Sequence, residues 1–282
     1  MPGRIDLHAH TTASDGSLTP AELVRLARDS GLAAVAVTDH DTVDGVAEGL
    51  AAGRELGFEV VPGVELSTDV RGKTVHILGY YLDHENAVLR EKLEWAKRVR
   101  NERNAKIVAR FRELRVDLTL AEVEAQAGGE VVGRPHFAAV LFKKGVVKSH
   151  QEAFDVYLDR KGKAYVPKFR FTPEESLGVI RRAGGLPVLA HPIEYDWSPT
   201  RLDEAVGELC ALGLVGIEVM YSTHNAAQVQ IYSDIAARRG LLRTGGSDFH
   251  GATKPDIKLG FGFSELLVPY EWLVELRQRA RP

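Results

Sequence analysis

Six of the ten histidines and three acidic residues of this 282-residue chain recur at one kind of position. Each lies within a short apolar run, at its end or just beyond it. Imidazole and carboxylate ligands without thiolates suit Mn, Fe or Zn, whereas Mg prefers oxygen ligands and water. Burying these groups together without cations would cost several kcal/mol per unpaired charge, so the pattern predicts a metal centre. The nine residues are His8, His10, Asp15, His40, Glu65, His76, His191, Asp248 and His250.

The apolar runs that carry these residues alternate with helix-like segments, which is typical of a βα repeat. Thr19 and Thr172 are each followed by proline and, three residues on, by glutamate, the pattern of a helix N-cap. In such α/β folds the carboxyl ends of the strands converge on one crevice. We therefore expect the nine donors to meet there. The runs are 4–10, 33–41, 59–65, 74–80, 186–192, 215–220 and 241–250.

Nine ligands exceed what one or two metal ions need, so three ions is the natural count. Three divalent ions and three carboxylates leave a charge of about +3 when the histidines are neutral, which attracts phosphate. Such ions lower the pKa of bound water and hold the attacking and leaving oxygens. The chemistry expected of this cluster is phosphoester hydrolysis.

The motifs around these residues resemble those of the PHP (polymerase and histidinol phosphatase) family. The resemblance covers both ends of the chain and leaves no ligand position unfilled. It implies a distorted (βα)7 TIM-like barrel with three divalent metals, manganese ahead of iron or zinc. The motifs are His8-Ala9-His10, Asp15, Thr38-Asp39-His40-Asp41, Gly63-Val64-Glu65, His76, His191-Pro192 and Ser247-Asp248-Phe249-His250.

The resemblance also implies how the ligands divide among the metals. Glu65 would bridge two ions, and a hydroxide shared between ions would be the nucleophile, without a covalent enzyme intermediate. The implied sets are His8, His10, Glu65 and Asp248 for one ion, Glu65, His76 and His191 for a second, and Asp15, His40 and His250 for the third.

Two aspartates flank His40. Asp39 would orient an imidazole, because metal-bound histidines usually donate their second N–H to an acceptor. For Asp41 we prefer a role as cap of the next helix.

The βα rhythm stops between 81 and 166, where helical periodicity takes over. We expect a helical insertion (cap) domain over 81–166, and a discontinuous barrel formed by 1–80 and 167–282. The insertion carries 17 Lys and Arg against 13 Asp and Glu, a net charge of +4, whereas the remainder has −7. A basic cap beside a metal cluster would hold a second phosphate of the substrate.

Arg134 and His136 are the candidates for that role. Arg134 precedes a predicted helix with proline at its first position, where free N–H groups, the helix dipole and a guanidinium favour an anion. The Arg-x-His-Phe-Ala pattern resembles the PHP subgroup of 3′,5′-nucleoside bisphosphate phosphatases and 5′-3′ exoribonucleases. This resemblance makes both residues substrate-phosphate ligands. Lys168 and His224 are weaker candidates at the rim of the site, and each is equally compatible with a solvated loop.

These features favour a phosphoesterase that converts a nucleoside bisphosphate, such as 3′-phosphoadenosine 5′-phosphate, to AMP and phosphate. A 5′-3′ exoribonuclease acting on short 5′-phosphorylated RNA is an alternative. A histidinol-phosphate phosphatase has no evident use for the arginine motif. Two other classes remain: a non-catalytic metal- or nucleotide-binding module, and a hydrolase of amides or cyclic substrates, although such enzymes commonly bridge their metals with a modified lysine.

Composition excludes several other classes. A net charge of −3 does not indicate a protein that coats nucleic acid, and 282 residues leave no room for a polymerase. The single cysteine, Cys210, rules out an internal disulfide and a cysteine-rich zinc site. No apolar run approaches the roughly 18 residues of a membrane span, and the N-terminus lacks a secretory apolar region. We expect a cytoplasmic protein without a membrane partner, and the sequence does not predict its oligomeric state.

Overall fold

The computed structural model describes residues 3–127, 132–262 and 266–280, and these form a mixed α/β structure. The predicted α/β class is confirmed. All seven apolar runs contribute a strand, and an eighth strand follows near the C-terminus. The strands are β1 (Arg4–Asp6), β2 (Ala34–Val37), β3 (Glu59–Val70), β4 (Lys73–Tyr80), β5 (Leu186–Leu189), β6 (Gly216–Tyr221), β7 (Leu242–Gly246) and β8 (Val268–Pro269).

The strands form one sheet in the order β7-β6-β5-β4-β3-β2-β1-β8, which follows the chain from β1 to β7. The sheet curls back on itself beyond β1, where the Leu7 N–H donates to the Gly245 carbonyl at 3.1 Å. Ala9 and Phe249 form a parallel bridge one step further on. These contacts close β1 onto β7, so the barrel implied by the family resemblance is present. Strand β8 pairs antiparallel with β1.

Strand β4 departs from the parallel βα pattern. It runs antiparallel to both β3 and β5 because β3 and β4 form a hairpin. Arg71 and Gly72 at its turn have φ of 53° and 80°, and positive φ at both central residues is the geometry of a tight type I′ turn. The sequence placed Glu65 at the end of a strand, but Glu65 lies in the middle of the twelve-residue strand β3. His76 lies beside it on β4.

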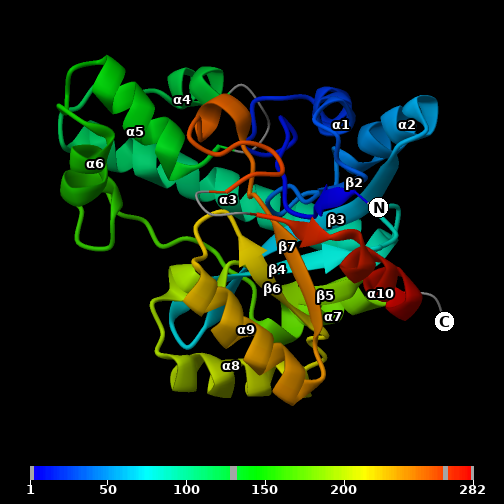
Figure 1. Cartoon of the computed structure of the whole chain (residues 1–282). Coiled ribbons are helices and arrows are strands. Elements are labelled where there is room, and N and C mark those ends of the chain that lie inside the picture. Colours follow the sequence, from blue (N-terminus) through cyan, green and yellow to red (C-terminus); the bar gives the residue numbers. More distant parts are fainter. Residues whose placement is uncertain (1–2, 128–131, 263–265, 281–282) are drawn as a thin grey trace. The chain divides into compact units, whose positions relative to one another are not determined.

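Helices connect most of the remaining strands. Both predicted N-caps are confirmed: Thr19 accepts from the Glu22 N–H, and Thr172 accepts from the Glu175 N–H. The helices of the barrel strands are α1 (Pro20–Asp29), α2 (Val46–Leu56), α7 (Pro173–Arg182), η2 (Pro192–Tyr195), α8 (Pro199–Ala211), α9 (Ala226–Arg239), η3 (Gly251–Thr253) and α10 (Tyr270–Ala280). Helices α1 and α2 pack on each other, and α9 packs on β6 and α8 (Figure 1).

The chain forms two compact units. One, called here the barrel unit, comprises Met1–Lys92 and Arg170–Pro282, and the other, the helical unit, comprises Leu93–Phe169. The helical unit falls within the region where the βα rhythm stops, apart from its last three residues. Its own core includes Ile107, Phe111 and Phe137. The helices between β4 and α7 are α3 (Ala87–Glu113), which begins in the barrel unit, α4 (Leu120–Ala127), α5 (Arg134–Lys143), α6 (His150–Ala153) and the π-helix η1 (Phe154–Leu158).

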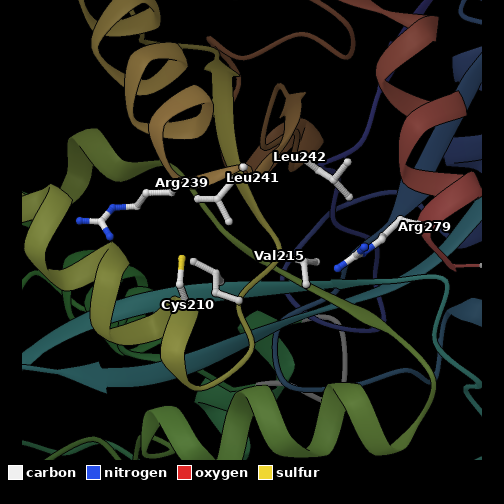
Figure 2. A pocket seen from close by; sticks show the side chains of 8 residues that line it. Cys210, Val215, Arg239, Leu241, Leu242 and Arg279 are labelled. Carbon is white, nitrogen blue, oxygen red and sulfur yellow. The ribbon is translucent and has the colours of Figure 1, made fainter.

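A pocket opens beside the amino ends of β6 and β7 (Figure 2). None of the nine candidate ligands lines it. Burial raises the pKa of its Cys210 thiol, which keeps that thiol protonated. The pocket is lined by Cys210, Leu214, Val215, Arg239, Gly240, Leu241, Leu242 and Arg279.

Within the described residues, no helix has both the length and the hydropathy of a membrane-spanning segment.

Candidate metal centre

All nine predicted ligands lie in the barrel unit, and the structure brings eight of them, all but His191, into three overlapping groups. The groups share residues because the ligands follow neighbouring strands and converge. Within each group, one ligand atom per residue lies within 4.8 Å of every other. The groups are His8, His10, Glu65 and Asp248; His40, Glu65 and His76; and His10, Asp15, His40 and His250.

Glu65 stands at the centre of the first two groups and is completely buried. Five imidazole rings face its two oxygens, and each oxygen has its own set of rings. Oε2 lies 3.4 Å from His8 Nε2, 3.3 Å from His10 Nε2 and 2.9 Å from His40 Nδ1. Oε1 lies 3.0 Å from His76 Nδ1 and 2.9 Å from His191 Nε2. A carboxylate whose two oxygens face separate sets of imidazoles is suited to bridge two metal ions.

Asp248 completes the group around Glu65 Oε2. Its Oδ1 atom lies 3.1 Å from His10 Nε2 and 3.6 Å from His8 Nε2. His191, which is absent from the three groups, lies 3.2 Å from His76 Nδ1 through its Nε2 atom. The ligand set implied for the second ion, Glu65 with His76 and His191, is therefore also close together.

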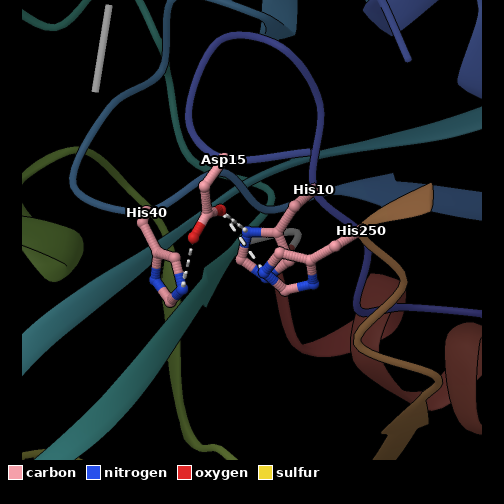
Figure 3. A group of neighbouring side chains, drawn as sticks. All are labelled: His10, Asp15, His40 and His250. Carbon is pink, nitrogen blue, oxygen red and sulfur yellow. Dashed lines mark ion pairs between the residues drawn. The ribbon is translucent and has the colours of Figure 1, made fainter. Parts of the chain in front are cut away.

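Asp15 organises the third group (Figure 3). Its Oδ1 atom lies 3.3 Å from His250 Nε2 and 3.7 Å from His10 Nδ1, while Oδ2 lies 3.9 Å from His40 Nε2. His10 and His40 each face Glu65 with one ring nitrogen and Asp15 with the other. The family resemblance assigned each of these rings to one ion only, whereas the geometry places both between two groups.

Many polar atoms of this cluster are buried without a hydrogen-bond partner. An unsatisfied buried polar atom costs about 1–3 kcal/mol, and so many in one place need an explanation. Nitrogen and oxygen atoms with free lone pairs at these distances are the donor set of a divalent transition metal, so the residues fit the expected metals. The atoms are His8 Nε2, both ring nitrogens of His10, His40 Nδ1, Glu65 Oε2, His76 Nε2 and His191 Nδ1.

The electrostatics of the cluster prepare its carboxylates for metal binding. Burial opposes ionisation of Glu65, but the neighbouring rings, His40 foremost, hold its pKa well below the usual range. The pKa values of Asp15 and Asp248 are lowered well below normal in the same way. Because metal ligands must be deprotonated, three ionised carboxylates are the state that a cation requires.

The imidazoles do not all share one protonation state. Burial lowers the pKa of His76 to about 4, so this ring is neutral and free to bind a metal. Burial also disfavours the charged form of His191, but its hydrogen bond to Glu65 raises the pKa to about 9. A metal that binds His191 must therefore displace a proton.

Glu218 on β6 supports two of the candidate ligands, and the sequence did not single it out. It is completely buried, and its Oε1 atom lies 3.0 Å from His8 Nδ1. Its Oε2 atom accepts the His191 backbone N–H at 2.6 Å. A proton held on His8 Nδ1 leaves Nε2 free for a metal, which is the usual function of a carboxylate behind a metal-bound histidine. The available signal was an acidic residue inside the apolar run 215–220.

Asp248 is held by two further residues that sequence reasoning missed. The Tyr221 hydroxyl at the end of β6 lies 2.9 Å from Asp248 Oδ2. Lys254 donates to the same oxygen at 2.7 Å. Both contacts leave Oδ1 directed at His8 and His10.

The two aspartates beside His40 have other roles than expected. Asp39 accepts from the Thr11 N–H and hydroxyl and from the Ser14 hydroxyl, so it holds the loop that carries Asp15 and does not orient an imidazole. Asp41 accepts from the Ser67 N–H. It does not cap α2, because the residue at that N-cap is Gly45.

The four predicted substrate ligands lie in different places. His224 is buried in the barrel unit, where its Nδ1 donates to the Val219 carbonyl at 2.8 Å and burial lowers its pKa to about 4. The other three belong to the helical unit. Arg134 begins α5 and donates to the Leu158 carbonyl at 3.1 Å. His136 Nδ1 accepts from the Gly133 N–H at 3.0 Å, and Lys168 lies in the segment that follows η1.

Several known proteins are similar to this chain in sequence or in structure. The PHP domain family model matches residues 6–159. A 3′,5′-nucleoside bisphosphate phosphatase of Chromobacterium violaceum is 35% identical, with 87% of each chain covered. A 5′-3′ exoribonuclease of Haemophilus influenzae is 32% identical over 89% of this chain and 91% of its own. A solved metal-dependent phosphoesterase from Bifidobacterium adolescentis superposes with a TM-score of 0.86, 33% identity and coverage of 99% and 97%.

Proposed function

This chain belongs to the PHP domain family of metal-dependent phosphoesterases, and from that premise we propose that it hydrolyses a 3′,5′-nucleoside bisphosphate. The substrate would be a small nucleotide such as 3′-phosphoadenosine 5′-phosphate, and the products AMP and inorganic phosphate. We propose that the nine residues of the cluster hold three divalent ions, manganese ahead of iron or zinc.

The observation that carries this proposal is the arrangement around Glu65, whose two oxygens face different sets of imidazoles. When bound, the metal ions would supply positive charge to the substrate phosphate and activate water for attack. The protein's part is to fix the ligands. Glu218 keeps a proton on His8 Nδ1, and Tyr221 and Lys254 hold one oxygen of Asp248.

The choice of a bisphosphate draws on the helical unit and on the relatives. A substrate with two phosphates needs a second cationic site, and the segment 81–166 carries a net charge of +4. We propose that Arg134 and His136 contribute to that site, with Lys168 and His224 as further substrate ligands. The bisphosphate phosphatase of C. violaceum supports this substrate class.

A second candidate function is a 5′-3′ exoribonuclease on short 5′-phosphorylated RNA. It is favoured by the H. influenzae relative, which carries that activity in its name. Both activities use a phosphate held away from the bond that is hydrolysed. For either, the structure and the single free cysteine are compatible with a cytoplasmic enzyme, which we include in the proposal.

The test is to supply the manganese-loaded protein with 3′-phosphoadenosine 5′-phosphate, with AMP and with a short 5′-phosphorylated RNA. We expect phosphate from the bisphosphate but not from AMP, because AMP lacks the second phosphate. Release of mononucleotides from the RNA at a higher kcat/KM would make the exoribonuclease the main activity.

Two ligand variants and one control link the activity to the cluster. Asp248→Ala and His40→Ala should each lower kcat/KM on the order of 10³-fold or more. Each substitution removes a ligand of the metal ions whose positive charge would stabilise the transition state. His84→Ala should have no effect, since His84 belongs to none of the three ligand groups and forms an ion pair with the exposed Glu85. Undiminished turnover after complete removal of metal would contradict the proposal.

A further inference from the structure

Lys254 lies beside the metal cluster, directly after η3. Its ammonium donates to Asp248 Oδ2 at 2.7 Å. The other oxygen of this carboxylate, Oδ1, faces the His8 and His10 rings. The ammonium and a metal ion can therefore bind the same carboxylate, each through its own oxygen.

The segment that carries Lys254 is held by the loop that follows β1. In this loop the Ser17 N–H donates to the His250 carbonyl at 3.0 Å, and the Ser17 hydroxyl accepts from the Ala252 N–H at 2.8 Å. The same loop carries Asp15, the acidic residue of the third ligand group. These contacts fix the backbone near Lys254 relative to the ligands.

Lys254 also lies on the side of the cluster that solvent reaches. Its side chain is 42% exposed, whereas that of Asp248 is 6% exposed. Among the nine candidate ligands, the side chain of Asp15 is the most exposed, at 27%. Partial burial opposes the charge of Lys254, but Asp248, followed by Glu194 and Asp15, raises the pKa of its ammonium. The ammonium therefore lies near the ligands through which a substrate reaches the cluster.

The ammonium of Lys254 has donors that the protein does not use. A lysine ammonium carries three N–H donors, and Asp248 accepts one of them. No second acceptor contacts it within the residues that the structure describes. A phosphate monoester presents three acceptor oxygens and carries about two negative charges at neutral pH. A positioned ammonium with unused donors is suited to bind such a group.

We propose that Lys254 is a catalytic residue whose ammonium donates to an oxygen of the phosphate group that is hydrolysed. Positive charge directed at a transferring phosphoryl group stabilises the transition state. Asp248 then has two roles, because Oδ1 faces the ligand rings and Oδ2 positions the ammonium. The inference rests on the proposed function and deepens it, since it assigns a protein contact to the phosphate that is removed and not to the one that is retained.

The experiment uses the full-length manganese-loaded protein and makes two measurements on each variant. One is the rate of phosphate release from 3′-phosphoadenosine 5′-phosphate, and the other is the Mn²⁺ affinity by calorimetry. Lys254→Met removes the charge from a side chain of similar length, and Lys254→Arg retains a charge and donors. Lys258→Met is the matched control, because Lys258 lies four residues further along and is exposed.

We expect Lys254→Met to lower kcat on the order of 10²-fold at saturating manganese, the usual loss when one donor to the transition state is removed. Its Mn²⁺ affinity should not fall, because the Tyr221 hydroxyl still contacts Asp248 Oδ2. Lys254→Arg should recover part of the lost kcat. Lys258→Met should match the wild type in both measurements.

Two outcomes would overturn the inference. One is a kcat of Lys254→Met equal to that of the wild type. The other is a fall in the Mn²⁺ affinity of Lys254→Met together with a kcat that returns to the wild-type value at higher manganese. In that second case Lys254 would act only by positioning Asp248 for the metal.

A binding measurement separates this inference from a failure of the proposed function. If the wild-type protein releases no phosphate from the bisphosphate, the proposed function fails. Calorimetric titration of the manganese-loaded protein with inorganic phosphate then decides the inference. An affinity about 10-fold weaker in Lys254→Met than in Lys258→Met, the loss of one charge-assisted hydrogen bond, supports the contact. Equal phosphate affinity in the two variants overturns it.

Discussion

At the scale of single residues, Glu218 connects two candidate ligands that come from different strands. Its two oxygens accept from the His8 ring and from the His191 backbone, at 3.0 Å and 2.6 Å. Both contacts are fully buried, so water does not replace them when they are lost. Both oxygens of Glu218 must act as acceptors. An amide side chain of the same shape has only one oxygen, so it satisfies only one of the two donors.

Glu218→Gln should therefore weaken metal binding while keeping the volume of the side chain. We expect manganese affinity to fall about 10- to 100-fold, the usual effect of removing a residue behind a metal ligand. Isothermal titration with Mn²⁺ measures the affinity directly. Glu275→Gln on the exposed face of α10 is the control and should bind manganese like the wild type. Equal affinity in the two variants would show that Glu218 does not orient the His8 ring for metal binding.

The sequence predicted eight of the nine candidate ligands because they end an apolar run or follow it, a position where side chains of different strands converge, and only His76 lies inside its run. Glu218 lies inside its run and not after it, so the same rule passes over it. Glu218 differs from an ordinary acidic residue by its complete burial. Burial depends on contacts distant in the sequence, which no local pattern contains.

At the scale of the elements, the closure of β1 onto β7 positions the first two histidines. Asp6 at the end of β1 accepts from the Ser247 N–H at 2.9 Å and from the His8 N–H at 3.1 Å. The two chain segments approach closely because Gly246 lacks a side chain. A Cβ atom there would lie 2.4 Å from both the Cβ and the backbone nitrogen of His8.

Gly246→Ala should therefore separate the two segments and displace His8. Overpacking of this kind costs roughly 1–3 kcal/mol, and we expect the upper part of that range because backbone and side chain must both move. Urea denaturation measures the loss of stability, and manganese titration measures the accompanying loss of affinity.

Gly178→Ala on α7 is the matched control for this variant. The nearest atom to its added Cβ is the flexible Arg182 guanidinium at 3.5 Å, so the substitution meets no backbone. It should leave stability unchanged or raise it by about 0.5–1 kcal/mol, since alanine favours a helix over glycine. Similar destabilisation by both substitutions would exclude a specific role for the close approach at Gly246.

The elements themselves were largely predictable, but the direction of β4 was not. Alternating apolar runs indicate where strands lie, and the caps at Thr19 and Thr172 indicate where helices begin. Periodicity does not reveal strand direction. The short connection through Arg71 and Gly72 was the available signal, because parallel neighbours need a crossover of a dozen or more residues.

At the scale of the whole molecule, the two units are stabilised in different ways. The barrel unit contains all nine candidate ligands, and several of their ring nitrogens and one oxygen of Glu65 are buried without a hydrogen-bond partner. The helical unit has a separate apolar core that includes Phe111, Phe137 and Leu141. Metal should therefore stabilise the barrel unit directly, through mass action on its folded state.

Removal of metal should increase hydrogen exchange in the loops after β1, β2, β5 and β7, because these loops carry most of the ligands. Manganese at about 100 times its Kd stabilises each site by about 2.7 kcal/mol, which corresponds to roughly 100-fold slower exchange where opening releases the metal. Peptides from the core of the helical unit, including those around Phe111 and Phe137, should exchange at the same rate with and without manganese. Mass spectrometry of chelated and manganese-loaded protein compares the two units in one experiment.

Asp248→Ala provides the control, because a chain that lacks this ligand should show a much smaller response to manganese in the same loops. If the wild-type helical unit also exchanged faster without metal, the two units would be coupled in stability, and metal binding would govern more of the chain than its ligands occupy. If the barrel loops did not respond, the buried unpaired atoms around Glu65 would need an explanation other than metal. The exchange rates of these loops therefore test the metal centre independently of any substrate.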